Sequence, residues 1–237
     1  MRVTNRFEYK YILDIRQFQA FKNHLQLYMD KGHFTKMAPN HRYLVRSLYY
    51  DTFDYQHYLE SEEGQYSRIK LRVRTYDYFL EQAKVISIEI KTKQGIHVKK
   101  YSELISPQEY LYFLEHKRFS KSTLILDEFM RLMNLQQLEP KLVVEYDREG
   151  YISKDGTDLR LTFDYEVKSK LSNQLFDYNH QLMNRHHHGI ICEIKCGMDK
   201  PEWLEHLIRK YGLRVKRNSK YTQAVKLIRP EILIDKF

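Results

Sequence analysis

Cysteine, glycine and proline are all scarce, with two, eight and five residues respectively in a chain of 237. On a strand, Cys192 and Cys196 would share a face but lie roughly 13 Å apart, too far for a disulfide. We therefore predict two buried, reduced thiols, as is usual for a cytosolic protein. No stretch rich in Pro, Gly or Ser divides the sequence, so we predict a single domain over residues 1–237.

Other absences exclude whole classes of protein and of site. No apolar run is long enough to span a bilayer, and residues 1–10 are charged, unlike a secretory signal. We therefore predict a cytoplasmic location. No Gly-rich phosphate loop, HExxH helix, CxxC pair or Ser/His/Asp motif is present. Consecutive His186, His187 and His188 cannot all face one metal without distorting a loop, which disfavours a ligand role.

Basic residues are abundant instead. Lys and Arg number 40 against 31 Asp and Glu, which gives a net charge of +9 and favours an anionic partner. Residues 67–76 alternate strictly, so a strand there would carry four cations on one face: Arg68, Lys70, Arg72 and Arg74. Cations about 7 Å apart repel one another unless water, carboxylates or a polyanion cover them. For one strand alone, a solvated face is the simpler interpretation.

Five further segments repeat this pattern. Three carry Glu-x-Lys on one strand face, namely Glu8 with Lys10, Glu89 with Lys91, and Glu193 with Lys195, and Arg6 and Lys93 extend the first two faces. Two more carry Arg148, and Arg160 with Asp164. Six strands with one charged and one apolar face, together with the expected peripheral helices, suggest an α+β fold whose sheet closes on itself with the charged face inward. A barrel of about eight strands is wide enough to hold a polar lumen or one ligand.

The remaining elements follow from local signals. Asp14 and Gln17 form a capping box for a first helix, and Ser106-Pro107 begins another. Further strands are expected at residues 4–13, 43–51, 85–93, 96–101, 142–151, 158–167 and 190–197. Further helices are expected at residues 122–134 and from about 201 and 219. Residues 31–40, 53–64 and 168–184 are expected to be loops or connectors, the second with one helical turn.

A polar cavity lined by Lys, Arg and a few Glu suits phosphate chains. Guanidinium and ammonium groups neutralise phosphate oxygens, and the accompanying divalent cation requires carboxylate oxygens. Phosphoryl transfer needs little covalent help from a protein, because positioning and charge neutralisation do most of the work. The residue types present are therefore sufficient for that chemistry.

Eight short motifs, in order, carry a resemblance to a known family. They are Arg6-x-Glu8-x-Lys10-Tyr11, Ser47-Leu48-Tyr49-Tyr50-Asp51, Lys70-x-Arg72-x-Arg74, Glu89-x-Lys91, Tyr146-x-Arg148, Leu159-Arg160-Leu161-Thr162-Phe163-Asp164, Glu193-x-Lys195 and Ser219-Lys220-Tyr221. The chain resembles the VTC domain, the polyphosphate polymerase branch of the triphosphate tunnel metalloenzymes. The resemblance implies a mostly antiparallel, closed eight-stranded tunnel barrel with a basic polar lumen and peripheral helices. It also implies Mn²⁺- or Mg²⁺-dependent transfer of the ATP γ-phosphate to a growing polyphosphate chain. One departure from the family is that no SPX-like helical domain precedes residue 1, so inositol-polyphosphate control of the eukaryotic kind is not expected in cis.

The resemblance implies roles residue by residue. The triphosphate or the chain would be gripped by Lys10, Arg72, Arg74, Lys91, Arg148, Arg160 and Lys220. Glu193 would hold the metal, with Lys195 on the same face. Glu8 and Glu89 are further candidate metal ligands, because they resemble the E-x-E-x-K carboxylates of hydrolytic relatives, but Arg6 stands where that signature has its first Glu. Plain cross-strand ion pairs are the alternative for Glu8, Glu89 and Glu193, and an exposed helical position is the alternative for Lys220.

Two other functions stay open at this point. One is hydrolysis of inorganic or nucleoside triphosphate on the same fold, which needs a positioned water molecule. The other is a non-catalytic module that binds polyphosphate or RNA. Residues 68–74 offer no aromatic stacking platform, which disfavours RNA. The expected partners are therefore ATP, polyphosphate and orthophosphate but no nucleic acid, and a separate membrane partner is left open.

Overall fold

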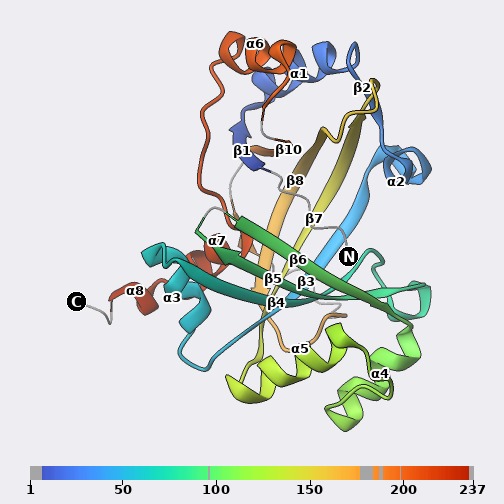
Figure 1. The fold of residues 1–237 in the computed structure, drawn as a ribbon, viewed down its shortest axis with the longest axis vertical. Helices are drawn as coiled ribbons and strands as arrows, with labels where there is room; N and C mark the ends of the chain where they lie inside the picture. Colours follow the sequence, from blue (N-terminus) through green and yellow to red (C-terminus); the bar gives the residue numbers. More distant parts are fainter. Residues whose placement is uncertain (1–6, 96, 177–183, 187–188, 198, 235–237) are drawn as a thin grey trace. The chain divides into compact units, whose positions relative to one another are not determined.

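A computed structural model describes all residues except 1–6, 96, 177–183, 187–188, 198 and 235–237 (Figure 1). The chain forms two compact units, each assembled from three separate segments. The first unit contains Met1–Tyr43, Tyr146–Val167 and His187–Asn218, and the second contains Leu44–Glu145, Lys168–His186 and Ser219–Phe237. The prediction of one domain over 1–237 stays a prediction. Arg6, His187 and His188 lie outside the described residues.

The first unit is a small antiparallel sheet covered by helices. Its strands are β1 (Phe7–Leu13), β10 (Ile190–Cys196), the first part of β8 (Arg160–Leu171), the second part of β7 (Glu139–Ser153) and β2 (Met29–Lys31). Strand β1 pairs with β10, β10 pairs with β8, and β2 pairs with β7. The helical segments are α1 (Ile15–Leu25), α2 (His33–Met37), the 3-10 turn η1 (Pro39–His41) and α6 (Glu202–Lys210).

One face of this sheet is apolar and packs on α1 and α6. Phe18 and Phe21 of α1 meet Phe163 of β8 edge-to-face, with ring centroids 5.0 and 6.4 Å apart. Cys192 and Cys196 lie in the same core as buried free thiols, as predicted. Since successive side chains on a strand alternate, the other face of β1, β8 and β10 is left for polar residues.

The second unit contains β3 (Tyr43–Asp51), β4 (Ser67–Thr75), β5 (Ile86–Gln94) and β6 (His97–Ile105), paired in that order and all antiparallel. The first part of β7 joins β3, and the short β9 (Asn184–Arg185) pairs with β8. The helical segments are α3 (Gln56–Glu63), η2 (Leu80–Gln82), α4 (Pro107–His116), α5 (Leu124–Leu135), α7 (Lys220–Ile228) and α8 (Glu231–Ile234).

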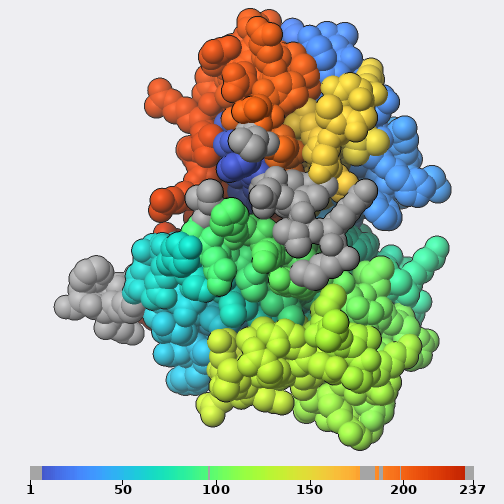
Figure 2. All heavy atoms as spheres, viewed as in Figure 1, coloured from blue at the N-terminus to red at the C-terminus, as the bar shows by residue number. Residues whose placement is uncertain are grey.

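Helices α4 and α5 cover the apolar face of β4–β6 in this unit. Leu71 and Val73 of β4 are completely buried with Ile88 and Ile90 of β5 against Phe129 of α5. In Figure 2 the atoms of α4 and α5 form one continuous block on the outside of these strands. The strict alternation predicted from the sequence is therefore confirmed for β4, and its basic residues lie on the face opposite this core.

Several local predictions are confirmed and several are wrong. Asp14 and Gln17 make both hydrogen bonds of the capping box, and Ser106 caps α4. Residues 31–40 are not a loop, because β2 ends at Lys31 and α2 and η1 follow. Residues 53–64 contain the eight-residue helix α3, which ends where Gly64 adopts φ +74°. Strand β8 extends into the expected loop 168–184, β6 reaches Ile105, and α8 was not anticipated.

The fold is α+β with a mostly antiparallel sheet, as predicted. The eight-strand path begins at β1 and ends at β6, and within the described residues no hydrogen bonds pair these two strands. Barrel closure is therefore not part of the observed fold. Among the described residues, no helix combines the length and the apolar composition needed to cross a membrane.

Candidate functional site

Each unit brings several of the predicted site residues together. We call the group in the first unit the carboxylate cluster, made of Glu8, Lys10, Arg148, Asp164 and Glu193. We call the group in the second unit the arginine cluster, made of Tyr49, Arg72, Arg74, Glu89 and Lys100. Each is described by itself.

In the carboxylate cluster, Lys10 lies between two carboxylates. Its Nζ is 3.0 Å from Glu8 Oε1 and 3.4 Å from Glu193 Oε1, and it donates to the backbone oxygen of Asn218 at 2.8 Å. The pairing of β1 with β10 sets Lys10 directly opposite Glu193. A single ammonium group between two carboxylates marks a position at which this site accepts positive charge.

Arg148 of β7 completes this cluster. Its Nε and Nη2 donate to the two oxygens of Asp164 at 2.6 and 2.8 Å, and Nη2 also lies 3.3 Å from Glu193 Oε2. Asp164 is completely buried. Burial acts to lower the pKa of the Arg148 guanidinium, but Asp164 and Glu193 outweigh burial and raise it. Arg148 is therefore always charged. Its bidentate pairing with a carboxylate fixes the orientation of its guanidinium group.

Arg160 of β8 and Lys195 of β10 lie further along the strands that carry Asp164 and Glu193. Lys195 stands opposite Arg160 of β8 on one side and Glu8 of β1 on the other. The Arg160 side chain is 56% exposed, and its Nε lies 3.5 Å from Asp158 Oδ1. The roles of Arg160 and Lys195 in the site stay predictions.

In the arginine cluster, a buried carboxylate holds several cations. Glu89 Oε2 accepts from Arg72 Nε at 2.7 Å and lies 2.6 Å from Arg72 Nη2, and Oε1 accepts from Lys100 at 2.9 Å. Arg74 Nη1 is 3.9 Å from the same Oε1. Burial alone would raise the pKa of Glu89, but Arg72, Arg74 and Lys100 hold it well below its ordinary value. Both oxygens of Glu89 are thus engaged by cations of the protein.

Residues of the neighbouring strand β3 hold the same two arginines from the other side. Arg72 Nη1 donates to Tyr49 Oη at 3.0 Å, and Arg74 Nε donates to Ser47 Oγ at 2.9 Å. The strand register explains both contacts, because Tyr49 and Ser47 stand directly opposite Arg72 and Arg74. On the other flank, Arg72 stands opposite Glu89. Each arginine is therefore positioned from both adjacent strands.

The polar face of β4–β6 continues beyond Glu89 as a row of like charges. Lys70, Lys91 and Lys100 stand opposite one another across the three strands, and Arg68 stands opposite Lys93. Within these three strands, all of whose residues are described, this face carries seven basic side chains and the single carboxylate of Glu89. Like charges placed directly opposite one another destabilise a sheet, so this face is suited to a polyanion.

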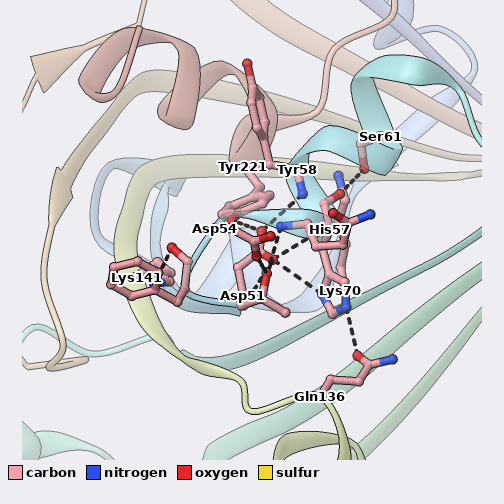
Figure 3. Close-up of polar contacts among 12 residues, drawn as sticks. Asp51, Asp54, His57, Tyr58, Ser61, Lys70, Gln136, Lys141 and Tyr221 are labelled. Carbon is pink, nitrogen blue, oxygen red and sulfur yellow. Dashed lines mark hydrogen bonds and ion pairs between the residues drawn. The ribbon is translucent and has the colours of Figure 1, made fainter. Parts of the chain in front are cut away.

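Lys220 lies at the start of α7, and a buried network around Asp51 fixes that helix (Figure 3). Asp51 is fully buried and accepts hydrogen bonds from the backbone amides of His57 and Tyr58 and from the hydroxyl of Tyr221. Lys70 Nζ donates to Ser219 Oγ, the N-cap of α7, at 3.0 Å. Lys220 itself is buried, which is contrary to an exposed helical position.

Several residues of these clusters carried no predicted role. Asp164, Tyr49 and Ser47 stand in the quoted motifs. Their signal was limited to their own strands, where Asp164 shares a face with Arg160, and Ser47 and Tyr49 share one with Asp51. Lys100 had no such signal, because its position next to Glu89 depends on the register of β5 with β6.

The VTC domain matches residues 5–229, nearly the whole chain. The chain belongs to the VTC domain family. The family prediction made from the eight motifs is thereby confirmed, and no curated protein matches the chain.

Solved structures show the fold. A candidate adenylate cyclase from Bacillus halodurans is 15% identical, with 91% of this chain and 94% of that chain covered and a TM-score of 0.56. A candidate adenylate cyclase from Vibrio parahaemolyticus (12% identical, 98% and 99% covered) and a protein from Pyrococcus horikoshii (15%, 98% and 99%) have TM-scores of 0.48 and 0.47. The first of these agrees with the triphosphate tunnel fold of VTC domains.

The family implies a divalent metal ion, which needs carboxylate oxygens as ligands. The described residues contain no group of three or more His, Cys, Asp or Glu side chains arranged to hold one. Mg²⁺ in phosphate sites, however, is typically held by one or two carboxylates plus substrate oxygens. Glu8 and Glu193, which share the Lys10 ammonium, fit that smaller requirement. Glu89 fits it less well, since its oxygens already bind Arg72 and Lys100.

Proposed function

We propose that this protein is a polyphosphate polymerase that transfers the γ-phosphate of ATP to a growing polyphosphate chain. The observation that carries the proposal is the polar face of β4–β6, with seven basic side chains against one carboxylate. Membership of the VTC domain family supports the same substrate class. The closed eight-stranded barrel and a cytoplasmic location belong to this proposal and not to the observed fold.

In this proposal the arginines neutralise the oxygens of the phosphoryl group in transfer. Arg72 and Arg74 are held from both sides, so little freedom is lost when they engage a phosphate. Arg148 is similarly held by Asp164. Lys10, Lys91, Lys195, Arg160 and Lys220 would add charge along the triphosphate or the chain. Preorganised cations of this kind lower the barrier because they need no rearrangement as charge develops.

Glu193, with Glu8 beside it, would hold Mn²⁺ or Mg²⁺ together with phosphate oxygens. When bound, the metal supplies positive charge that withdraws electrons from the transferred phosphoryl group. We assign Glu89 a different role, that of counter-ion to Arg72, Arg74 and Lys100, because these cations occupy its oxygens. Its role as a metal ligand stays a prediction.

Hydrolysis of triphosphate is the second candidate function. The observation that favours it is the pair of carboxylates on Lys10, because two carboxylates at a metal resemble the arrangement of hydrolytic relatives. A polymerase must instead exclude attacking water from the phosphoryl group.

The deciding experiment is to incubate the purified protein with ATP and Mn²⁺, with or without short-chain polyphosphate, and to resolve the products on a gel. A ladder of polyphosphate supports the polymerase. Free phosphate without a ladder supports the hydrolase, and no turnover with retained polyphosphate binding supports a binding module. Glu193→Gln and Arg72→Lys should each reduce this activity.

A further inference from the structure

Tyr49 occupies an unusual position for a tyrosine hydroxyl. Its side chain is only 7% exposed, yet its hydroxyl lies on the polar face of the sheet and accepts a hydrogen bond from Arg72 Nη1 at 3.0 Å. Its ring stacks on that of Tyr221, with centroids 5.0 Å apart and planes inclined by 26°. The ring is thus fixed by α7, and the oxygen is fixed by β4.

Among the described residues, the proton of this hydroxyl has no acceptor. Within the described part of the chain, the hydrogen bond from Arg72 is the one polar contact of Tyr49 Oη, and Tyr49 is the acceptor in it. The nearby carboxylates are engaged elsewhere, because Tyr221 donates to Asp51, and Glu89 binds Arg72 and Lys100. A buried hydroxyl normally satisfies its donor, so an acceptor from solvent or from a ligand completes this one.

The charges around Tyr49 define that ligand. Arg72 and Arg74 of β4 and Lys220 of α7 all act on its phenol, and their attraction outweighs burial, so that the pKa of Tyr49 lies below its ordinary value of 10. An acceptor that enters among three cations must itself be anionic. A phosphate oxygen satisfies both requirements.

We propose that Tyr49 is a substrate-binding residue whose hydroxyl donates its proton in a hydrogen bond to a phosphate oxygen held by Arg72, Arg74 and Lys220. This inference rests on the proposed function, because it needs a triphosphate or polyphosphate substrate. It adds to the cationic site one neutral donor, which is directional where a Lys ammonium is not. The hydrogen bond is charge-assisted and therefore among the stronger ones.

The proposal has a consequence for pH dependence. Ionised Tyr49 cannot donate and would repel the phosphate, so substrate must favour the protonated phenol. Binding should therefore weaken as the pH rises through the pKa of Tyr49, and binding above that pH should take up a proton. Lys100 also titrates within the pH range of such an experiment, because burial lowers its pKa to about 8 against the opposing effect of Glu89. A comparison with a variant that lacks only the Tyr49 hydroxyl separates the two groups.

The test is calorimetric binding of inorganic tripolyphosphate to the wild-type protein, Tyr49→Phe and Tyr50→Phe between pH 7 and pH 10. Tyr50 is the matched control, since its side chain lies in the apolar core on the opposite face of β3. At pH 7 we expect Tyr49→Phe to bind about tenfold more weakly, and Tyr50→Phe to bind within twofold of wild type. Between pH 7 and pH 10 the affinity of Tyr49→Phe should fall less than that of the other two.

A second measurement does not depend on the size of the affinity change. Tripolyphosphate added at alkaline pH should reduce the tyrosinate absorbance of wild type and Tyr50→Phe but not of Tyr49→Phe. Equal affinities and equal pH dependence in all three proteins would overturn the role of Tyr49 and leave the proposed function intact. No tripolyphosphate binding by the wild type at any pH would instead overturn the proposed function.

Discussion

The substitution Glu89→Gln tests whether the arginine cluster is held together by one buried charge. Glu89 is 1% exposed and contacts Arg72 and Lys100 directly, with Arg74 at 3.9 Å. The amide keeps the shape of the side chain but leaves these cations without a counter-ion. Removing one partner of a buried ion pair costs about 3–5 kcal/mol. Because the Lys100 side chain is 45% exposed, we expect the lower end, about 3 kcal/mol at pH 7.

The pH dependence of this loss follows from the pKa of Glu89. The pKa is lowered in the folded protein, so the stabilisation is fully present above the unfolded value of about 4.3. It is lost progressively as the pH falls from the unfolded value to the lower folded value. The difference in unfolding free energy between wild type and Glu89→Gln should therefore be constant from pH 7 to pH 5. It should decrease toward more acidic pH.

Urea unfolding at pH 7, 5 and 3, followed by circular dichroism, measures this difference. Glu81→Gln is the matched control, because it removes the same charge from an exposed residue of η2. Tripolyphosphate should stabilise Glu89→Gln more than wild type, since it supplies the missing negative charge. An unfolding free energy within about 0.5 kcal/mol of wild type at pH 7 would refute the counter-ion role.

Three further predictions concern activity. Glu193→Gln should lower turnover at least a hundredfold with little change in thermal stability, and near-normal turnover with Mn²⁺ would remove Glu193 from the site. Asp164→Asn should lower kcat about tenfold or more, because the Arg148 guanidinium group would no longer be held by two charge-assisted hydrogen bonds. An unchanged kcat would show that this ion pair has only a structural role. Arg72→Lys and Arg74→Lys keep the net charge but remove the planar guanidinium group. Each should therefore raise the activation free energy by about 2–4 kcal/mol, while tripolyphosphate affinity changes only a few fold. If turnover survives both, the binding module is favoured.

Strand faces and helix caps were accessible from the sequence because both depend on neighbouring residues. The alternation in residues 67–76 predicted β4 and its basic face, and Asp14 with Gln17 predicted the start of α1. Residues 31–40 were assigned to a loop because Gly32 and Pro39 suggested one. There, the pairing of β2 with β7 accounts for Lys31, and the short helical segments α2 and η1 occupy most of the rest.

The contacts of the site residues were less accessible, because they depend on register. The Glu-x-Lys pattern identifies the face on which Glu89 lies, and the resemblance to hydrolytic relatives makes it a candidate metal ligand, which stays a prediction. That pattern cannot show that Arg72 of another strand stands directly opposite. The same limit applies to Lys100, whose neighbour Glu89 lies on a different strand. A pattern within one strand identifies a face, whereas the function of a charge is decided by the strands beside it.

The two clusters use the same physical arrangement, although they lie in different units of the chain. In each, an arginine is fixed by a buried carboxylate of an adjacent strand, Asp164 for Arg148 and Glu89 for Arg72. A free arginine side chain would lose considerable rotamer freedom on binding a phosphate, and this loss would oppose binding. An arginine already held by a carboxylate has lost that freedom on folding. We therefore expect these carboxylates to matter for turnover as much as the arginines that they hold, even though a negative charge near a polyanion would by itself weaken binding.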